Sequence, residues 1–147
     1  MTIHRSFTAE QTYNFGYEMA KDARQGDVVA LIGDLGVGKT VFAKGFADGI
    51  GVKEPVASPT FMIVCEYDQG RLALYHFDVY RIEDIEELFE IGFEEYLYGD
   101  GVCLIEWADR VISELPQETV VVEIRKVPGE DTQRREIAVC RKEEYGQ

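Results

Sequence analysis

The chain has 147 residues, room for one domain spanning residues 1–147, and its 46% hydrophobic content is enough for a single core. Its formal net charge is -13, and because an acidic surface repels polyphosphate backbones, extensive direct contact with nucleic acid is disfavoured. If the protein acts on RNA, a more basic partner is expected to make most of the contact. The first residues lack the apolar segment of a signal peptide, and no apolar run approaches the ~18 residues needed to span a bilayer, so a cytoplasmic location without membrane contact is expected.

The first half of the chain predicts two helices on either side of a buried strand. A helix is predicted over residues 9–24, with Tyr13, Tyr17 and Ala20 on one face. Residues 28–32 are apolar throughout, which is typical of a strand buried on both faces. A glycine-rich turn follows, and then a second helix is predicted over residues 39–48.

The second half predicts mainly strands. Two apolar runs, 61–67 and 72–77, flank a short polar turn and indicate a β-hairpin. Residues 84–97 predict a single helix, whose glutamate-rich face is either solvated surface or a docking site for a basic partner. The apolar stripe of that helix is expected to consist of Ile85, Leu88, Phe89, Gly92 and Tyr96. Further strands are predicted over residues 101–105, 119–126 and 136–140. The pattern favours an α/β fold of three layers, in which a mixed, partly parallel sheet carries antiparallel hairpins.

The three cysteines give no sign of a metal or redox site. Cys65, Cys103 and Cys140 form no C-x-x-C pair, and all lie in strand-like runs. They are expected to be reduced, buried side chains that behave as small hydrophobic groups.

The glycine-rich turn matches the phosphate-binding pattern G-x-x-x-x-G-K-[ST] at every fixed position. Its residues are Gly33, Asp34, Leu35, Gly36, Val37, Gly38, Lys39 and Thr40. The glycines let the backbone turn tightly and direct N–H groups at phosphate oxygens, and the positive end of the following helix faces the same anion. Lys39 is expected to reach the β- and γ-phosphates and Thr40 to ligate Mg²⁺. A strand before and a helix after are the context that this motif requires, which favours a nucleotide site over a mere glycine-rich turn.

Two acidic residues close apolar strands and are candidates for the magnesium side of the site. Glu106 ends the run 102–106, where a carboxylate is costly unless it is paired, bound to metal or at the exposed strand tip. Asp78 ends the run 74–78 and could ligate Mg²⁺ or orient the attacking water. The alternatives are a surface charge for Glu106 and a turn-capping side chain for Asp78.

Three neighbouring features leave more than one interpretation open. His76 points the same way as Asp78 in an extended strand, and a structural role is favoured over a catalytic one. Arg81 could contact phosphate or pair with nearby acids. Residues 58–61, Ser-Pro-Thr-Phe, are either a loop that senses the γ-phosphate or a turn that introduces a strand.

Five motifs, taken together, resemble the TsaE family. They are G-D-L-G-x-G-K-T, S-P-T-F, Y-H-F-D-x-Y-R, E-L-x-x-x-G-x-E-E-Y and the Glu106-Trp107 pair, in this order. The resemblance covers nearly the whole chain. It implies the small ATPase component of the bacterial machinery that makes threonylcarbamoyladenosine (t6A) in tRNA, with ATP and Mg²⁺ bound.

The same resemblance implies partners and site residues. The partners are a heterodimer of two ASKHA-fold subunits, TsaD-like and TsaB-like, one of which transfers the threonylcarbamoyl group and through which tRNA is mainly contacted. By motif, the family's site falls on Lys39, Thr40, Asp78, Glu106 and Trp107, and, through looser matches, on Thr12 and Arg134. Lys39, Asp78 and Glu106 take the catalytic positions, and Thr40, Asp78 and Glu106 the magnesium positions.

Three rival functions are less favoured by the sequence. A small-molecule kinase usually has a lid with clustered arginines, whereas the only adjacent arginines here are Arg134 and Arg135. A small GTPase needs an N-K-x-D element, and the only asparagine, Asn14, precedes Phe15. A binding module that uses ATP only to set its shape would not hydrolyse it. For this protein, ATP hydrolysis is expected to be slow in isolation and faster in the complex.

Overall fold

The computed structural model describes residues 1–34, 36–56, 59 and 63–145. Its strands are β1 (Thr2–Ser6), β2 (Val28–Ile32), β3 (Val64–Tyr67), β4 (Leu74–Asp78), β5 (Val102–Glu106), β6 (Val120–Lys126) and β7 (Arg135–Arg141). Its α-helices are α1 (Ala9–Lys21), α2 (Lys39–Ile50), α3 (Glu86–Glu90) and α4 (Phe93–Leu97). Short 3₁₀ helices are η1 (Ala108–Arg110), η2 (Ile112–Glu114) and η3 (Lys142–Glu144).

All seven strands form one mixed sheet in the order β1-β7-β6-β2-β5-β4-β3. The four central strands, β6, β2, β5 and β4, run parallel, and the pairs β1–β7, β6–β7 and β3–β4 are antiparallel. The predicted mixed sheet with antiparallel hairpins is therefore confirmed. Strand β1 is an addition to the prediction, because four of its five residues are exposed and give no apolar pattern to recognise.

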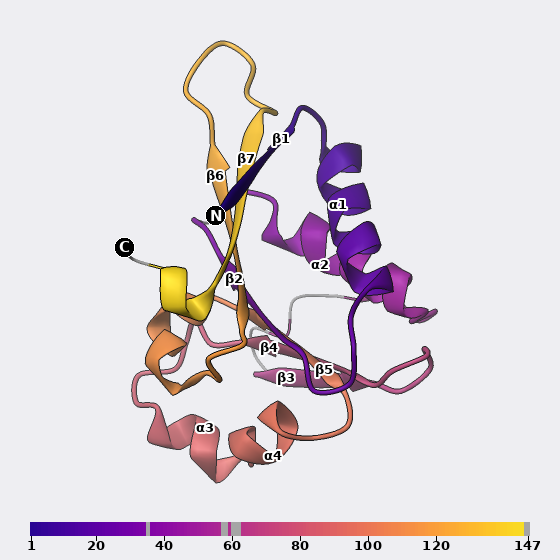
Figure 1. The fold of residues 1–147 in the computed structure, drawn as a ribbon, viewed down its shortest axis with the longest axis vertical. Helices are drawn as coiled ribbons and strands as arrows, with labels where there is room; N and C mark the ends of the chain where they lie inside the picture. The colour runs from indigo at the N-terminus through magenta and orange to yellow at the C-terminus, as the bar shows by residue number, and fades with distance from the viewer. Residues whose placement is uncertain (35, 57–58, 60–62, 146–147) are drawn as a thin grey trace.

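The sheet separates two hydrophobic cores, which confirms the three-layer α/β arrangement. Helices α1 and α2 cover one face, and α3 and α4 lie on the other side of the sheet with the 3₁₀ helices (Figure 1). Along β2, Val29 and Leu31 belong to the core under α1 and α2, while Val28 and Ala30 belong to the opposite core. This alternation follows from the two-residue period of a strand.

Helix α1 packs on α2 through glycines, so its buried face differs from the predicted one. The residues that α1 buries are Thr12, Gly16 and Ala20, and the Tyr17 side chain is 36% exposed. A Cβ on Gly16 would lie 3.1 Å from the backbone nitrogen of Phe46 and still closer to the Phe42 carbonyl. The small residue at position 16 therefore sets how closely the two helices approach.

Residues 84–97 form two helices, which makes the prediction of a single helix wrong. Gly92 adopts a φ of +85°, a conformation that favours glycine, and it divides α3 from α4. The side chains buried here are Leu88, Phe93 and Leu97, whereas Phe89, expected in the apolar stripe, is 37% exposed. The break rotates the second half of the segment, so one helical stripe cannot describe both halves.

The three cysteines are free thiols, two of them buried, Cys103 and Cys140, and Cys65 partly buried. Among the described helices, none has both the length and the apolar character that a membrane crossing requires.

Candidate nucleotide-binding site

The turn between β2 and α2 has the backbone shape of a phosphate cradle. Gly36 and Gly38 have φ values of +73° and +115°, which side chains with a Cβ rarely adopt. A Cβ on Gly33 would lie 2.7 Å from the Ile124 carbonyl oxygen, so only glycine fits there. The Val37 side chain is buried and anchors the loop. Leu35, which is part of the predicted motif, lies outside the described residues.

Lys39 stands at the first turn of α2 with its amine inside the loop. The amine donates a hydrogen bond to the Gly33 carbonyl and lies 3.2 Å from the ring centroid of Trp107. Burial lowers the pKa of Lys39, while the nearby charges of Glu106 and Asp78 raise it. The Lys39 amine is therefore poorly hydrated, and it lies at the point where the motif requires a contact with phosphate.

Asp78 and Glu106 lie side by side on adjacent parallel strands. Their Cα atoms are register partners in the β4–β5 pair, and both side chains are almost fully buried. Each shares its strand face with a leucine of the core under α2, Leu74 on β4 and Leu104 on β5. Both carboxylates consequently point to the side of the sheet that α2 covers.

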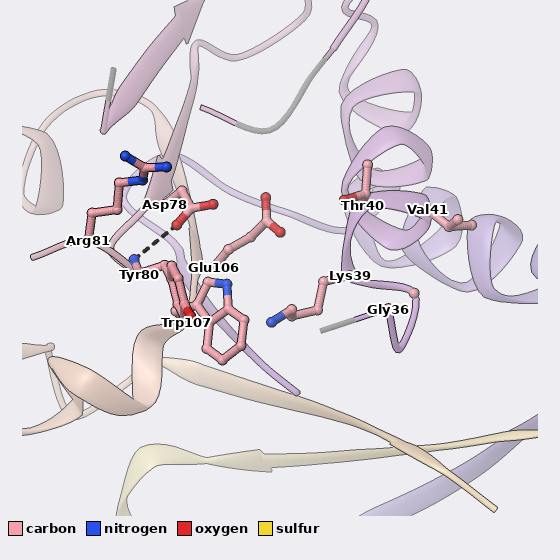
Figure 2. Close-up of a pocket in the computed structure, with 10 residues that line it drawn as sticks. Gly36, Lys39, Thr40, Val41, Asp78, Tyr80, Arg81, Glu106 and Trp107 are labelled. Carbon is pink, nitrogen blue, oxygen red and sulfur yellow. Dashed lines mark hydrogen bonds between the residues drawn. The ribbon is translucent and has the colours of Figure 1, made fainter. Parts of the chain in front are cut away.

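Asp78 both caps a turn and lines the site. Its carboxylate accepts a hydrogen bond of 2.9 Å from the Tyr80 N–H, which is the turn-capping role that the sequence left as an alternative. It also faces the cavity next to Arg81 and Tyr80 (Figure 2). The two roles coexist because a carboxylate can accept several hydrogen bonds at once.

Glu106 is paired rather than exposed at the strand tip. Its Oε2 lies 2.6 Å from Nε2 of His76, and His76 is 1% exposed. The pairing offsets part of the cost of burying a carboxylate, which is why an apolar strand can end on this residue.

A cavity of about 410 Å³ joins the loop to the two carboxylates. It is lined by Gly36, Gly38, Lys39, Thr40, Val41, Asp78, Tyr80, Arg81, Glu106 and Trp107. Figure 2 shows the Glu106 carboxylate between Asp78 and the α2 residue Thr40, with Lys39 and Trp107 below it. The predicted catalytic residues Lys39, Asp78 and Glu106 thus share one cavity.

The donors in this cavity fit Mg²⁺ bound together with phosphate groups. No group of three or more histidine, cysteine, aspartate or glutamate residues is close enough to hold a metal within the described ranges. Magnesium is usually held by one or two carboxylates plus waters and substrate phosphates, so a dedicated protein cage is not needed. The exposed Thr40 and the two carboxylates supply that smaller set of oxygens.

A second cavity of about 190 Å³ continues from the loop toward α1 and β7. Thr12 and Arg135 line it together with Gly36, Gly38 and Val41, which also line the first cavity. Thr12 therefore lies beside the loop.

The C-terminal arginine at this cavity is Arg135 and not the predicted Arg134. The Arg135 guanidinium lines the second cavity and donates a hydrogen bond of 2.7 Å to the Val37 carbonyl. The Arg134 guanidinium lies 5.4 Å from the centroid of the Phe7 ring. Arg134 lies before the first residue of β7, and its N–H bonds back to the Asp131 carbonyl, whereas Arg135 begins the strand beside the cavity.

Trp107 and Tyr80 form an aromatic wall of the first cavity. Trp107 has a φ of +61°, uncommon for a residue with a side chain, and its ring lies 4.7 Å from that of Tyr80. Tyr80 and Val41 were missed by the sequence analysis, although Tyr80 belongs to the Y-H-F-D-x-Y-R motif. Of the Ser-Pro-Thr-Phe segment only Pro59 is described, so the predicted switch-like loop lies outside the described residues.

Comparison with known proteins identifies the family. The family model described as "Threonylcarbamoyl adenosine biosynthesis protein TsaE" matches residues 6–137. The chain belongs to the TsaE family. It is 48% identical over 127 residues to the tRNA threonylcarbamoyladenosine biosynthesis protein TsaE of Bacillus subtilis, covering 86% of this chain and 78% of the relative.

Other TsaE-family comparisons agree. The protein of the same name from Treponema pallidum is 48% identical over 120 residues, covering 82% of this chain and 88% of the relative. The crystal structure of Bacillus subtilis YdiB matches with a TM-score of 0.78 at 43% identity, covering 92% of this chain and 82% of that one. Sequence and fold therefore point to the same family.

Proposed function

We propose that this protein is a Mg²⁺-dependent ATPase that supports the formation of threonylcarbamoyladenosine in tRNA, in complex with the two threonylcarbamoyl-transfer subunits. The observation that carries the ATPase part is the single cavity in which the Lys39 amine and the Thr40 side chain face two buried carboxylates. The tRNA part is supported by membership of a family named for this modification.

Each side chain of the site has a task in this proposal. Lys39 holds the β- and γ-phosphates as a point charge, and the glycine-rich loop offers N–H groups to the same oxygens. Thr40 and Glu106 would hold Mg²⁺, and Asp78 would either join them or orient the attacking water. Bound Mg²⁺ would supply neutralisation of the charge that develops on the phosphate oxygens. Trp107 and Tyr80 wall the cavity and limit the access of water to it.

The second cavity takes the part of the nucleotide beyond the phosphates. Its wall is mainly apolar or small, with the Thr12 and Arg135 side chains as its polar contributors beside Gln133. The sequence lacks the N-K-x-D element that reads guanine, which favours ATP as the nucleotide.

The acidic composition favours an indirect role on tRNA. At a formal net charge of -13 the chain would be repelled by a phosphate backbone, so the heterodimeric partner is assigned most of the contact with tRNA. Hydrolysis is then expected to be slow in the isolated protein and faster in the complex.

The test compares Lys39→Met with Lys44→Met, an exposed lysine on the same helix. Phosphate release from ATP is measured with and without the partner heterodimer, and t6A in tRNA is measured by mass spectrometry. Lys39→Met should lower turnover by about 100-fold or more, because a preorganised charge at the transferring phosphoryl group is lost. Lys44→Met should match the wild type.

Two results would overturn the proposal. ATP turnover at the wild-type rate by the isolated Lys39→Met protein would show that the glycine-rich loop and its lysine are not needed for hydrolysis. Transfer of a labelled γ-phosphate to a metabolite instead of water would favour a small-molecule kinase.

A further inference from the structure

His76 lies behind the Glu106 carboxylate and reaches the cavity only through it. The imidazole is 1% exposed, and its Nε2 is 2.6 Å from Oε2 of Glu106. We propose that His76 is a positioning residue that holds the Glu106 carboxylate in the orientation that Mg²⁺ and ATP require. This inference rests on the proposed ATPase function and adds to it a residue that touches neither the nucleotide nor the metal.

The geometry assigns the proton of this hydrogen bond to Nε2 of His76. Two bare acceptors at 2.6 Å would repel each other, and the proposed metal role requires an ionised Glu106, so the imidazole Nε2–H donates to the carboxylate. Nδ1 is buried and has no hydrogen-bond partner among the described residues. A proton on Nδ1 alone would therefore leave a buried donor unpaired and would also remove the donor from Glu106.

The contact occupies one oxygen of Glu106 and leaves the other for the cavity. Glu106 lines the cavity with Asp78 and Thr40, whereas His76 lies one strand away on the same face of the sheet. Hydrogen bonds to charged groups are shorter and stronger than neutral ones, so this bond restricts the rotation of a side chain that otherwise has several rotamers.

Without His76, Glu106 has a competing partner in Lys39. Both groups line the same cavity, and the Glu106 charge opposes the lowering of the Lys39 pKa by burial. A carboxylate released from His76 would turn toward the Lys39 amine and away from the metal position, while the amine itself stays in the phosphate-binding loop. His76 keeps the two apart by fixing where the carboxylate points.

The test replaces His76 in the full chain by glutamine or by asparagine, whose side-chain amides differ in length. In His76→Gln the amide nitrogen can take the place of imidazole Nε2 and donate to Glu106, whereas the shorter side chain of His76→Asn cannot. The same substitution at the exposed His4 is the control. Calorimetry measures the affinity for the β,γ-imido analogue of ATP with and without Mg²⁺, and thermal unfolding reports stability separately.

We expect the effect of Mg²⁺ on analogue affinity to be lost in His76→Asn but not in His76→Gln. In His76→Asn the gain in analogue affinity on adding Mg²⁺ should fall by about 10- to 100-fold, the usual cost of removing a partner that orients a metal ligand. Affinity without Mg²⁺ should stay close to wild type, and His76→Gln should retain most of the magnesium-linked gain.

Two outcomes overturn the inference. One is a wild-type magnesium-linked gain in His76→Asn. The other is a loss of this gain in a folded His76→Gln protein, a criterion that holds even if His76→Asn does not fold. If Glu106→Gln loses the gain in analogue affinity on adding Mg²⁺ while both His76 variants show the same gain as each other, only the positioning role fails. If the wild-type protein binds the analogue without any effect of Mg²⁺, the proposed function fails as well.

Discussion

Gly45 lies in the middle of α2, where that helix meets the main chain of α1. A Cβ built on Gly45 would lie 2.8 Å from the carbonyl carbon of Tyr13 and closer still to its oxygen. The obstacle is backbone in the interior of a helix, so no side-chain rotation can relieve it. Gly45→Ala therefore forces α1 and α2 apart.

Two effects of opposite sign decide the magnitude of this change. Replacing glycine by alanine inside a helix stabilises that helix by about 1 kcal/mol. Overpacking a close contact costs about 1–3 kcal/mol, and a main-chain obstacle places this site at the upper end. The net expectation is a loss of about 2 kcal/mol in the free energy of unfolding, or about 6 °C in Tm for a chain of this size.

Thermal and urea unfolding followed by circular dichroism measure the effect, with Lys44→Ala as the control. Lys44 is the exposed neighbour of Gly45 on α2, and its substitution should change stability by less than about 0.5 kcal/mol. A Gly45→Ala protein with a higher Tm than the wild type would show that helix propensity outweighs packing, and would refute the reasoning. An unchanged Tm would place the cost of overpacking at only about 1 kcal/mol.

Three further predictions concern the fold and its titrating groups. The Arg71 guanidinium donates to three carbonyls at the C-terminal end of α1, so Arg71→Met should lower stability by about 1 kcal/mol in thermal unfolding. Burial raises the pKa of Cys103 to about 12, so the unfolded chain loses this proton first and stability falls as pH rises above about 8.5. Between pH 8 and 10 the free energy of unfolding, measured with urea, should therefore fall by about 2 kcal/mol less in Cys103→Ala than in the wild type. The hydrogen bond to Asp48 raises the pKa of Tyr13 to about 12, and Asp48→Asn should lower it toward 10 in an NMR titration of labelled tyrosine.

Each of these has a result that contradicts it. An Arg71→Met protein as stable as the wild type would mean that the guanidinium contacts add nothing to stability. Parallel stability curves for the wild type and Cys103→Ala above pH 8 would exclude a protonated thiol in the folded state. A Tyr13 pKa that stays near 12 in Asp48→Asn would assign the shift to another cause.

Local features of the chain were readable without the structure. The glycine spacing in residues 33–40 and the apolar run before it predicted a phosphate cradle, because a tight loop that presents N–H groups depends on neighbours in sequence. The placement of Asp78 and Glu106 also followed from local pattern, since each ends an apolar run and the ends of parallel strands meet at one edge of a sheet. Each of these features is determined by a short stretch of consecutive residues, so it can be predicted from the sequence alone.

Other features depended on which segments pair across the fold. The register between β4 and β5 brings His76 to Glu106, and the start of β7 places Arg135, rather than Arg134, at the second cavity. Strand β1 pairs with the edge that β7 offers. A one-residue step in a strand reverses the direction of a side chain, so such choices rest on pairing between distant segments that no local pattern specifies. The sequence by itself predicted a phosphate-binding loop, and only the tertiary structure decided which side chains share a cavity with it.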